Sequence, residues 1–147
     1  MAYHVRRQLR EAVATAVTSL TTTGTRVYQS RVYPFQTTDL PCLVVTTDGD
    51  QVTNLTADSN PQQQRETRLK IEAYARDTID LDDILDLICK EVETAIASSS
   101  TSLVANLYFI GTQIDIEASG DQKIGKATLL FSTDLYTVSN APDVLIG

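Results

Sequence analysis

Apolar residues recur along the chain with two different spacings, and each spacing predicts a different kind of element. From Val5 to Leu20 they recur every three or four positions, which places them on one stripe of a helix. The same spacing from Leu81 to Ile96 predicts a second helix. Between residues 67 and 76, apolar and charged residues alternate strictly, as expected of a strand with one buried face.

Local signals set the ends of the two helices. Thr21–Gly24 follows the first helix, and Gly24 can take the left-handed conformation that is common just after a helix. Asp80 precedes the second helix as a candidate N-cap, and Asp83 completes a loose capping box. The serine-rich segment 98–102 is expected to end that helix in a polar loop.

Four further segments have the composition of strands. Residues 25–33 are rich in Val and Tyr and end at a proline, and residues 42–47 form a nearly continuous apolar run that predicts burial on both faces. Residues 107–118 and 124–138 are joined by a short turn, which predicts an antiparallel hairpin. In residues 107–118 we expect the even positions to share one face, from Tyr108 to Ile116.

Four segments lack a clear period. Residues 34–41 contain two prolines and are expected to form a loop. Residues 48–50 read as a turn, and residues 51–64, hereafter the arm, are polar and loop-like, although a short strand and a projecting hairpin are compatible with them. Residues 139–147 are expected to form an irregular C-terminal tail.

The order of helix, three or four strands, helix and two strands predicts one α+β domain over residues 1–147. We expect a two-layer sandwich, with a mainly antiparallel sheet and both helices on one face. A chain of this length can bury a core without disulfides. Cys42 and Cys89 form no metal-binding motif and are expected to be buried thiols.

Composition and charge narrow the classes of function. The chain carries 12 basic and 19 acidic residues, a net charge of −7, which disfavours specific duplex binding through phosphate neutralisation. No apolar run reaches the length that spans a bilayer, and the first residues show no signal-peptide pattern. We therefore expect no association with a membrane.

Candidates for catalysis or metal binding are few. The one histidine, His4, is expected on the surface at the start of the first helix, and the common nucleotide, hydrolase and zinc motifs are absent from the sequence. The densest acidic cluster, residues 77–86, coincides with a helix start, where carboxylates offset the helix dipole. We expect no enzymatic activity, no cofactor and no metal ion.

The charged face of the strand 67–76 carries both signs and a tyrosine. It is either a solvated outer face or an interface, where Arg and Tyr are enriched. The residues of this face are Arg68, Lys70, Glu72, Tyr74 and Arg76.

The order of these patterns resembles the tail terminator proteins of tailed bacteriophages, which are also called tail completion or tail-tube capping proteins. The resemblance spans residues 5–138. It rests on a first helix with Arg7-Gln8-Leu9-Arg10-Glu11, a strand 26–33 ending at Pro34, a strand opened by Leu40-Pro41, the alternating strand 69–74, a helix 81–85 after an acidic cap, and the last strand 127–136.

The resemblance implies a homohexameric ring that caps the tail tube, stops its polymerisation and forms the joint to the head-side connector, or neck, protein. DNA would pass through the lumen without specific binding. The protein would lie in the tail or neck of the virion, after assembly in the host cytoplasm. Two alternatives stay open, namely another ring-forming neck or tail-tube component, and a small ligand-binding α+β domain.

In such a ring, the charged face and the arm become candidate contacts with a neighbouring subunit or with the tail tube. We expect Arg68 and Arg76 in particular to contact a neighbouring subunit. The arm residues in this set are Gln62, Gln63 and Gln64, and a loop with Phe35, Gln36 and Asp39 is the candidate surface for the connector.

Overall fold

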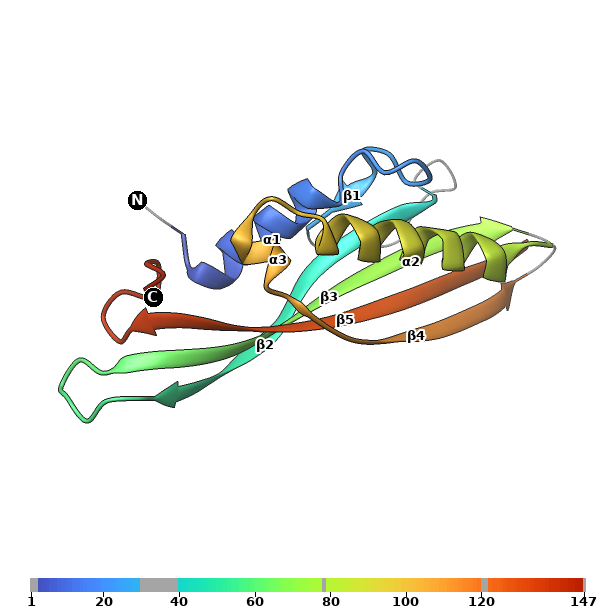
Figure 1. Ribbon diagram of the computed structural model, residues 1–147. Coiled ribbons are helices and arrows are strands. Elements are labelled where there is room, and N and C mark those ends of the chain that lie inside the picture. Colours follow the sequence, from blue (N-terminus) through green and yellow to red (C-terminus); the bar gives the residue numbers. More distant parts are fainter. Residues whose placement is uncertain (1–2, 30–39, 78, 120–121, 147) are drawn as a thin grey trace.

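A computed structural model describes residues 3–29, 40–77, 79–119 and 122–146. It contains an open five-stranded sheet with helices on one face, which confirms the predicted α+β fold (Figure 1). The strands lie in the order β1–β2–β3–β5–β4, and every neighbouring pair is antiparallel except β1 with β2. The elements are α1 (Val5–Ala16), β1 (Val27–Tyr28), β2 (Cys42–Asn54), β3 (Gln62–Asp77), α2 (Leu81–Ala97), α3 (Ser102–Ala105), β4 (Tyr108–Ser119) and β5 (Gln122–Val138).

The first helix, α1, packs over β2 and buries the predicted apolar stripe. It ends at Ala16, one turn earlier than the periodicity predicts, because the chain turns through Ser19 with a positive φ of 69°. Gly24 has the predicted left-handed backbone, with φ 59°, but it lies in this later turn. His4 lies at the start of α1, as predicted, and is half-buried. It is the N-cap residue, since its Nδ1 accepts a hydrogen bond from the Arg6 backbone N–H at 3.1 Å.

The second helix, α2, packs over β3 and β5. Gly125 of β5 lies beneath it, so close that a Cβ there would come within 2.8 Å of the Leu85 Cδ1 atom. Asp80 is the N-cap residue, but its side chain forms no capping hydrogen bond with the helix, so the predicted capping box is wrong. The carboxylates of Asp82 and Asp83 still lie in the first turn, where they offset the helix dipole.

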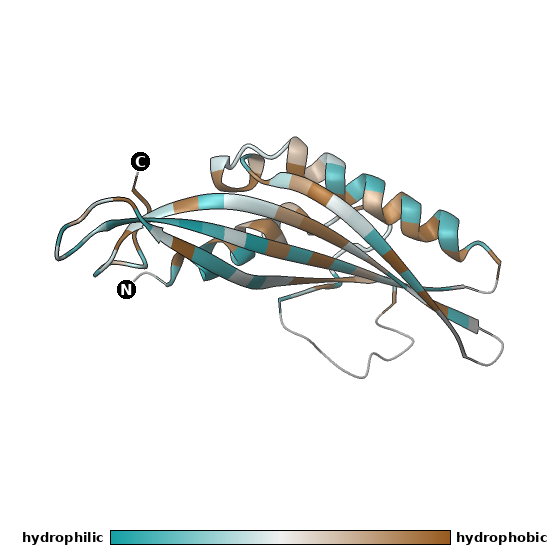
Figure 2. Cartoon of the chain, turned by 90° about the horizontal axis from the view of Figure 1, so that it is seen from below, coloured by the Kyte–Doolittle hydropathy of each residue, from teal (hydrophilic) through white to brown (hydrophobic). Residues whose placement is uncertain are grey.

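The core lies between the sheet and the helices. The odd positions of β3 are buried there, as the alternating pattern predicts, together with odd positions of β5. Figure 2 shows the alternation of hydrophilic and hydrophobic residues along the strands. The short helix α3 follows the serine-rich loop that was expected to end the second helix, and it adds the fully buried Val104. The largest buried sheet side chains are Leu43, Leu69, Ile71, Leu129 and Phe131.

The arm is a projecting hairpin, one of the outcomes that its sequence allows: residues 51–54 and 62–64 are strand, and residues 55–61 between them form a loop. β2 runs on through the expected turn to Asn54, with an irregularity between Thr47 and Asp50, and β3 begins at Gln62. The resulting hairpin extends beyond the helices (Figure 1). The hydrophobic pattern does not predict these strands, because their side chains are polar. They form because the backbone hydrogen bonds of β2 with β3 and of β3 with β5 do not depend on the side chains.

A register shift in β4 changes which of its side chains share a face. Phe109 pairs with Phe131, but the next pair joins Gly111 to Leu130, so the alternation reverses between them. The prediction that all even positions share one face is therefore wrong for Tyr108, which lies opposite the outward-facing Ser132. From residue 112 onwards the even positions face the helix side, as expected.

Candidate assembly surfaces

The outer face of β3 contains an ion cluster centred on Glu72. The Tyr74 hydroxyl donates a hydrogen bond to Glu72 Oε2 at 3.1 Å, Lys126 Nζ of β5 lies 3.5 Å from the same oxygen, and Lys70 Nζ lies 3.9 Å from Oε1. Glu72 and Tyr74 are buried within the chain itself. This part of the predicted charged face is thus not a solvated surface.

The two arginines of the charged face differ in accessibility. The Arg68 side chain is 63% exposed, and its Nη2 lies 4.0 Å from Glu66 Oε1. At this exposure the guanidinium is available to a partner. Arg76 is half-buried and lines a shallow pocket with Leu40, Pro41 and Ile84. The structure contains no partner chain, so the interface role expected of both arginines stays a prediction.

The base of the arm is held by a buried carboxylate. Asp50 Oδ2 of β2 accepts from Arg6 Nη1 of α1 at 2.8 Å and from Arg65 Nη1 of β3 at 3.0 Å. Arg65 Nε also donates to Thr137 Oγ1 of β5 at 3.1 Å. Burial alone would raise the pKa of Asp50, but the two arginine hydrogen bonds outweigh it and the pKa is lowered. These bonds join four elements, α1, β2, β3 and β5, where the arm leaves the body.

Further along the arm, the predicted glutamines are only partly accessible. Gln62 is exposed, whereas Gln63 and Gln64 are half-buried. The Gln63 amide donates to Asn54 Oδ1 across the hairpin at 3.1 Å, and its Oε1 accepts from Arg65 at 3.3 Å. The arm residues therefore include one freely accessible glutamine and one that stabilises the hairpin.

The C-terminal tail is irregular, as predicted, but it is fixed to the body. The Val5 N–H donates to the Pro142 carbonyl at 3.0 Å, and the Gln8 side chain donates to the Asp143 carbonyl at 2.8 Å. Near the tip of the arm, Asn60 and Asn140 exchange two hydrogen bonds of 2.9 and 3.0 Å. The tail thus ties the start of α1 to the arm.

The edge strand β4 exposes apolar side chains. Phe109, Ile114 and Ile116 face the helix side of the sheet, but α2 lies over β3 and β5 and leaves them 42–44% exposed. Hereafter these three residues are the β4 strip. Contiguous exposed apolar surface marks interaction sites more often than isolated apolar residues do.

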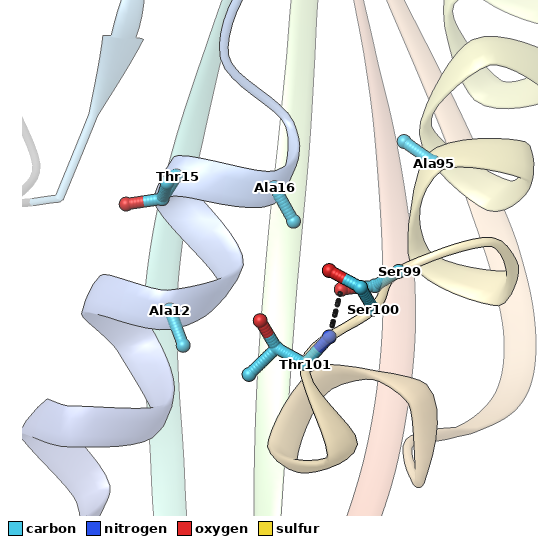
Figure 3. Close-up of a pocket in the computed structure, with 7 residues that line it drawn as sticks. All are labelled: Ala12, Thr15, Ala16, Ala95, Ser99, Ser100 and Thr101. Carbon is cyan, nitrogen blue, oxygen red and sulfur yellow. Dashed lines mark hydrogen bonds between the residues drawn. The ribbon is translucent and has the colours of Figure 1, made fainter.

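One groove lies between α1, α2 and the start of α3, and Figure 3 shows its lining. Only small side chains and hydroxyl groups line it, and the Thr101 N–H donates to Ser99 Oγ at 3.2 Å. None of its lining residues is acidic, basic or a histidine, so the groove offers no general acid or base. The lining residues are Ala12, Thr15, Ala16, Ala95, Ser99, Ser100 and Thr101.

The described ranges hold no candidate metal centre or membrane-spanning helix. Within them, no three His, Cys, Asp or Glu side chains gather in a way that could hold a metal ion. None of the described helices has the length and apolarity needed to cross a membrane. The predicted connector loop with Phe35, Gln36 and Asp39 lies outside the described residues.

Sequence reasoning missed two features of these surfaces. Arg65 occupies an inward position of β3, and a charge at an apolar-face position was the signal that a buried partner such as Asp50 was needed. The exposure of the β4 strip is the second feature, because periodicity shows which residues share a face but not whether a helix covers that face. Phe109 lies on the same face as Ile114 only because of the register shift in β4.

Comparisons with known proteins give a likeness in structure but none in sequence family. The chain matches no protein-family model and no curated protein. A solved structure described as the virion of a native gene transfer agent (GTA) particle is similar over 91% of this chain and 92% of the matched chain, with 17% sequence identity and a TM-score of 0.47. At this identity and TM-score, the likeness assigns no function.

Proposed function

We propose that this chain is a structural subunit of a phage-type tail, which assembles into a homohexameric ring and caps the tail tube. The ring stops the addition of further tube subunits and forms the joint to the head-side connector. Its role is mechanical, and we propose no catalytic activity, cofactor or metal for it. The sequence resemblance over residues 5–138 supplies the specific role.

The observation that carries the proposal is the β4 strip. Its three apolar side chains lie on the core-facing side of the sheet and still reach solvent, because the helix layer of one chain is too narrow to cover them. A sheet that is left partly uncovered is expected of a subunit whose surface is completed by neighbours.

The arm and the exposed Arg68 side chain are our candidate contacts with the tail tube. The arm extends beyond the helices, and its base is fixed by the Asp50 cluster, so it can present side chains at a defined position (Figure 1). Its tip, residues 55–59, is exposed and polar except for Leu55 and Ala57. Polar, well-positioned groups of this kind are typical of the rim of an interface.

The net charge agrees with passage of DNA through the ring. Each chain carries −7, so the ring as a whole repels phosphates. A basic lumen would instead bind the backbone of the duplex and slow its transit.

A tube-length assay tests the proposal. Purified chain is added to polymerising tail-tube protein encoded in the same genome, and tube lengths and ends are measured by negative-stain electron microscopy. We expect shorter tubes and a ring at one end of each tube. Tubes of unchanged length with bare ends would contradict the capping role, and incorporation along the tube would assign the chain to a polymerising component instead.

A further inference from the structure

Within the ranges that the structure describes, both edges of the sheet are open, and they carry different strands. β4 forms one edge, and its outer side pairs with no strand in the described ranges. At the other edge, β1 pairs with Leu43 and Val44, and among the described residues no strand pairs with the outer side of residues 45–54 of β2. Residues 51–54 of β2 are all exposed. Free strand edges are templates for pairing with another chain.

The helix flank above the β4 edge is acidic. Asp82, Asp86 and Glu93 lie on one side of α2 at helical spacing, and Glu91 lies on the other side, where it binds Thr22 after α1. Because α1 packs over β2 and α2 over β3 and β5, the side away from α1 faces β4. The carboxylates therefore form a rim over the β4 strip.

The helix flank above the β2 edge is basic. Arg6 and Arg10 lie one turn apart on α1, and Arg6 binds Asp50 of β2, whereas Arg10 Nε lies 3.4 Å from Gln29 Oε1 beside β1. The opposite flank of α1 faces α2 through small residues (Figure 3). α1 contains three arginines and one glutamate, whereas α2 contains five carboxylates and one lysine.

An exposed apolar residue accompanies the basic flank. Val52 of β2 pairs with Arg65, an inward-facing position, so it lies on the helix side of the sheet, yet it is 41% exposed. Each edge therefore presents a free strand, exposed apolar surface on the helix side and a charged helix flank. The two flanks have opposite signs.

We propose that the β4 edge of one copy docks against the β2 edge of a second copy, so that the sheet continues from subunit to subunit. This inference rests on the proposed ring and names its subunit interface. The acidic flank of α2 then faces the basic flank of the neighbour's α1, and the β4 strip is covered by that helix. The contact is heterologous, which is the type that closes into a ring.

The strand directions fit such a ring. β2 and β5 run in one direction, and β3 and β4 run in the other. A rotation about an axis inclined to the strands, as in a barrel, keeps β4 antiparallel to the neighbouring β2. The inclination also shifts the neighbour along the strands, which the contact needs because Ile114 is level with Leu43, whereas Val52 is level with Leu135 of β5. Closure by repeated rotation removes every open edge, which is how barrels avoid uncontrolled edge pairing.

Two single substitutions separate the two sides of the interface. Ile114→Lys places a charge in the β4 strip, and Arg10→Glu reverses the charge of the α1 flank. Sedimentation velocity over a concentration series should show that each variant alone has lost ring formation, with at least a tenfold weaker association than the parent chain. An equimolar mixture should form one-to-one dimers and stop there, because each variant keeps one intact edge.

Two control variants carry the same charge changes outside the proposed interface, and two milder substitutions serve if a test variant unfolds. Leu87→Lys adds the same charge at a similarly exposed residue on the other flank of α2, and Lys90→Glu makes the same charge change as Arg10→Glu. Both should assemble like the parent chain. If Ile114→Lys or Arg10→Glu melts far below its control, Ile114→Thr and Arg10→Gln take its place.

Three other sedimentation results would each contradict the proposed contact between β4 and β2. If Arg10→Glu alone still forms dimers that Ile114→Lys cannot form, β4 pairs with β4 in a two-fold contact. If all variants assemble normally, the ring uses another surface and the capping proposal stands. If the parent chain is monomeric at every concentration, free copies make no such contact, and the tube-length assay then decides the capping role separately.

Discussion

The ion cluster at the base of the arm allows a quantitative test of the structure. Asp50→Asn keeps the size of the side chain but removes the charge that binds Arg6 and Arg65. The Asp50 and Arg65 side chains are 12% and 11% exposed, so Arg65 would keep its charge in a largely dry site without a counter-charge.

The size of the effect follows from what Arg65 retains. Breaking a buried ion pair by removing one partner costs roughly 3–5 kcal/mol. Arg65 keeps its hydrogen bonds to Thr137 and Gln63, and Arg6 is about one-third exposed, so solvent screens its share. We therefore expect Asp50→Asn to lower the free energy of unfolding by about 2–3 kcal/mol and the Tm by roughly 4–12 °C.

The pH dependence gives the same prediction a second readout. Because the folded-state pKa of Asp50 is lowered, its contribution is full above the unfolded pKa of about 3.9 and is lost as the pH falls through the folded value. The difference in stability between the parent chain and Asp50→Asn should thus be constant from pH 5 to 7 and shrink below pH 4.

Urea unfolding followed by circular dichroism measures both effects. Glu11→Gln is the control, because it breaks the exposed pair between Arg7 and Glu11 on α1, and its stability should equal that of the parent within error. An Asp50→Asn variant as stable as this control would refute the reasoning. A stability difference that persists undiminished at pH 2 would refute the assigned role of the Asp50 charge.

Three further predictions concern the helix layer. Gly125→Ala should destabilise the chain by about 1–2 kcal/mol in urea unfolding, because its Cβ would clash with a leucine of α2, whereas Gly111→Ala has open space and should change little. The Thr22 N–H and Oγ1 donate to the Glu91 carboxylate at 2.9 and 2.6 Å. Glu91→Gln should therefore lower the free energy of unfolding by about 1–2 kcal/mol and speed amide exchange at Thr22, and unchanged exchange would contradict this bond. Burial and neighbouring carboxylates raise the pKa of Cys89 to about 11, so iodoacetamide at pH 8 should alkylate its peptide at least tenfold more slowly in the folded chain than in urea, and equal rates would contradict the burial.

The fold was largely predictable because both periodicities are strong. The helical stripe from Leu81 to Ile96 and the alternation from Leu69 to Ala75 each admit one element, and both are observed. The arm was not predictable in the same way. Its strands are stabilised by the backbone pairing of β2 with β3 and of β3 with β5, and a run such as Gln62–Gln64 has no apolar face to signal a strand.

The candidate surfaces were less predictable than the fold. Whether Ile114 is buried depends on the width of the helix layer, and this width cannot be predicted from a local sequence pattern. Glu72 and Tyr74 show the opposite error, since a position that alternates outward was taken to be accessible and is instead buried in an ion cluster. Arg68, on the same face, is accessible as expected.

The central claim is that six copies of this chain close into a ring. Size-exclusion chromatography with multi-angle light scattering, followed by negative-stain imaging of each peak, tests it most directly. The account predicts a species of about six times the 16.1 kDa chain mass with six-fold symmetric rings. Open filaments, or closed particles with another number of copies, would contradict it.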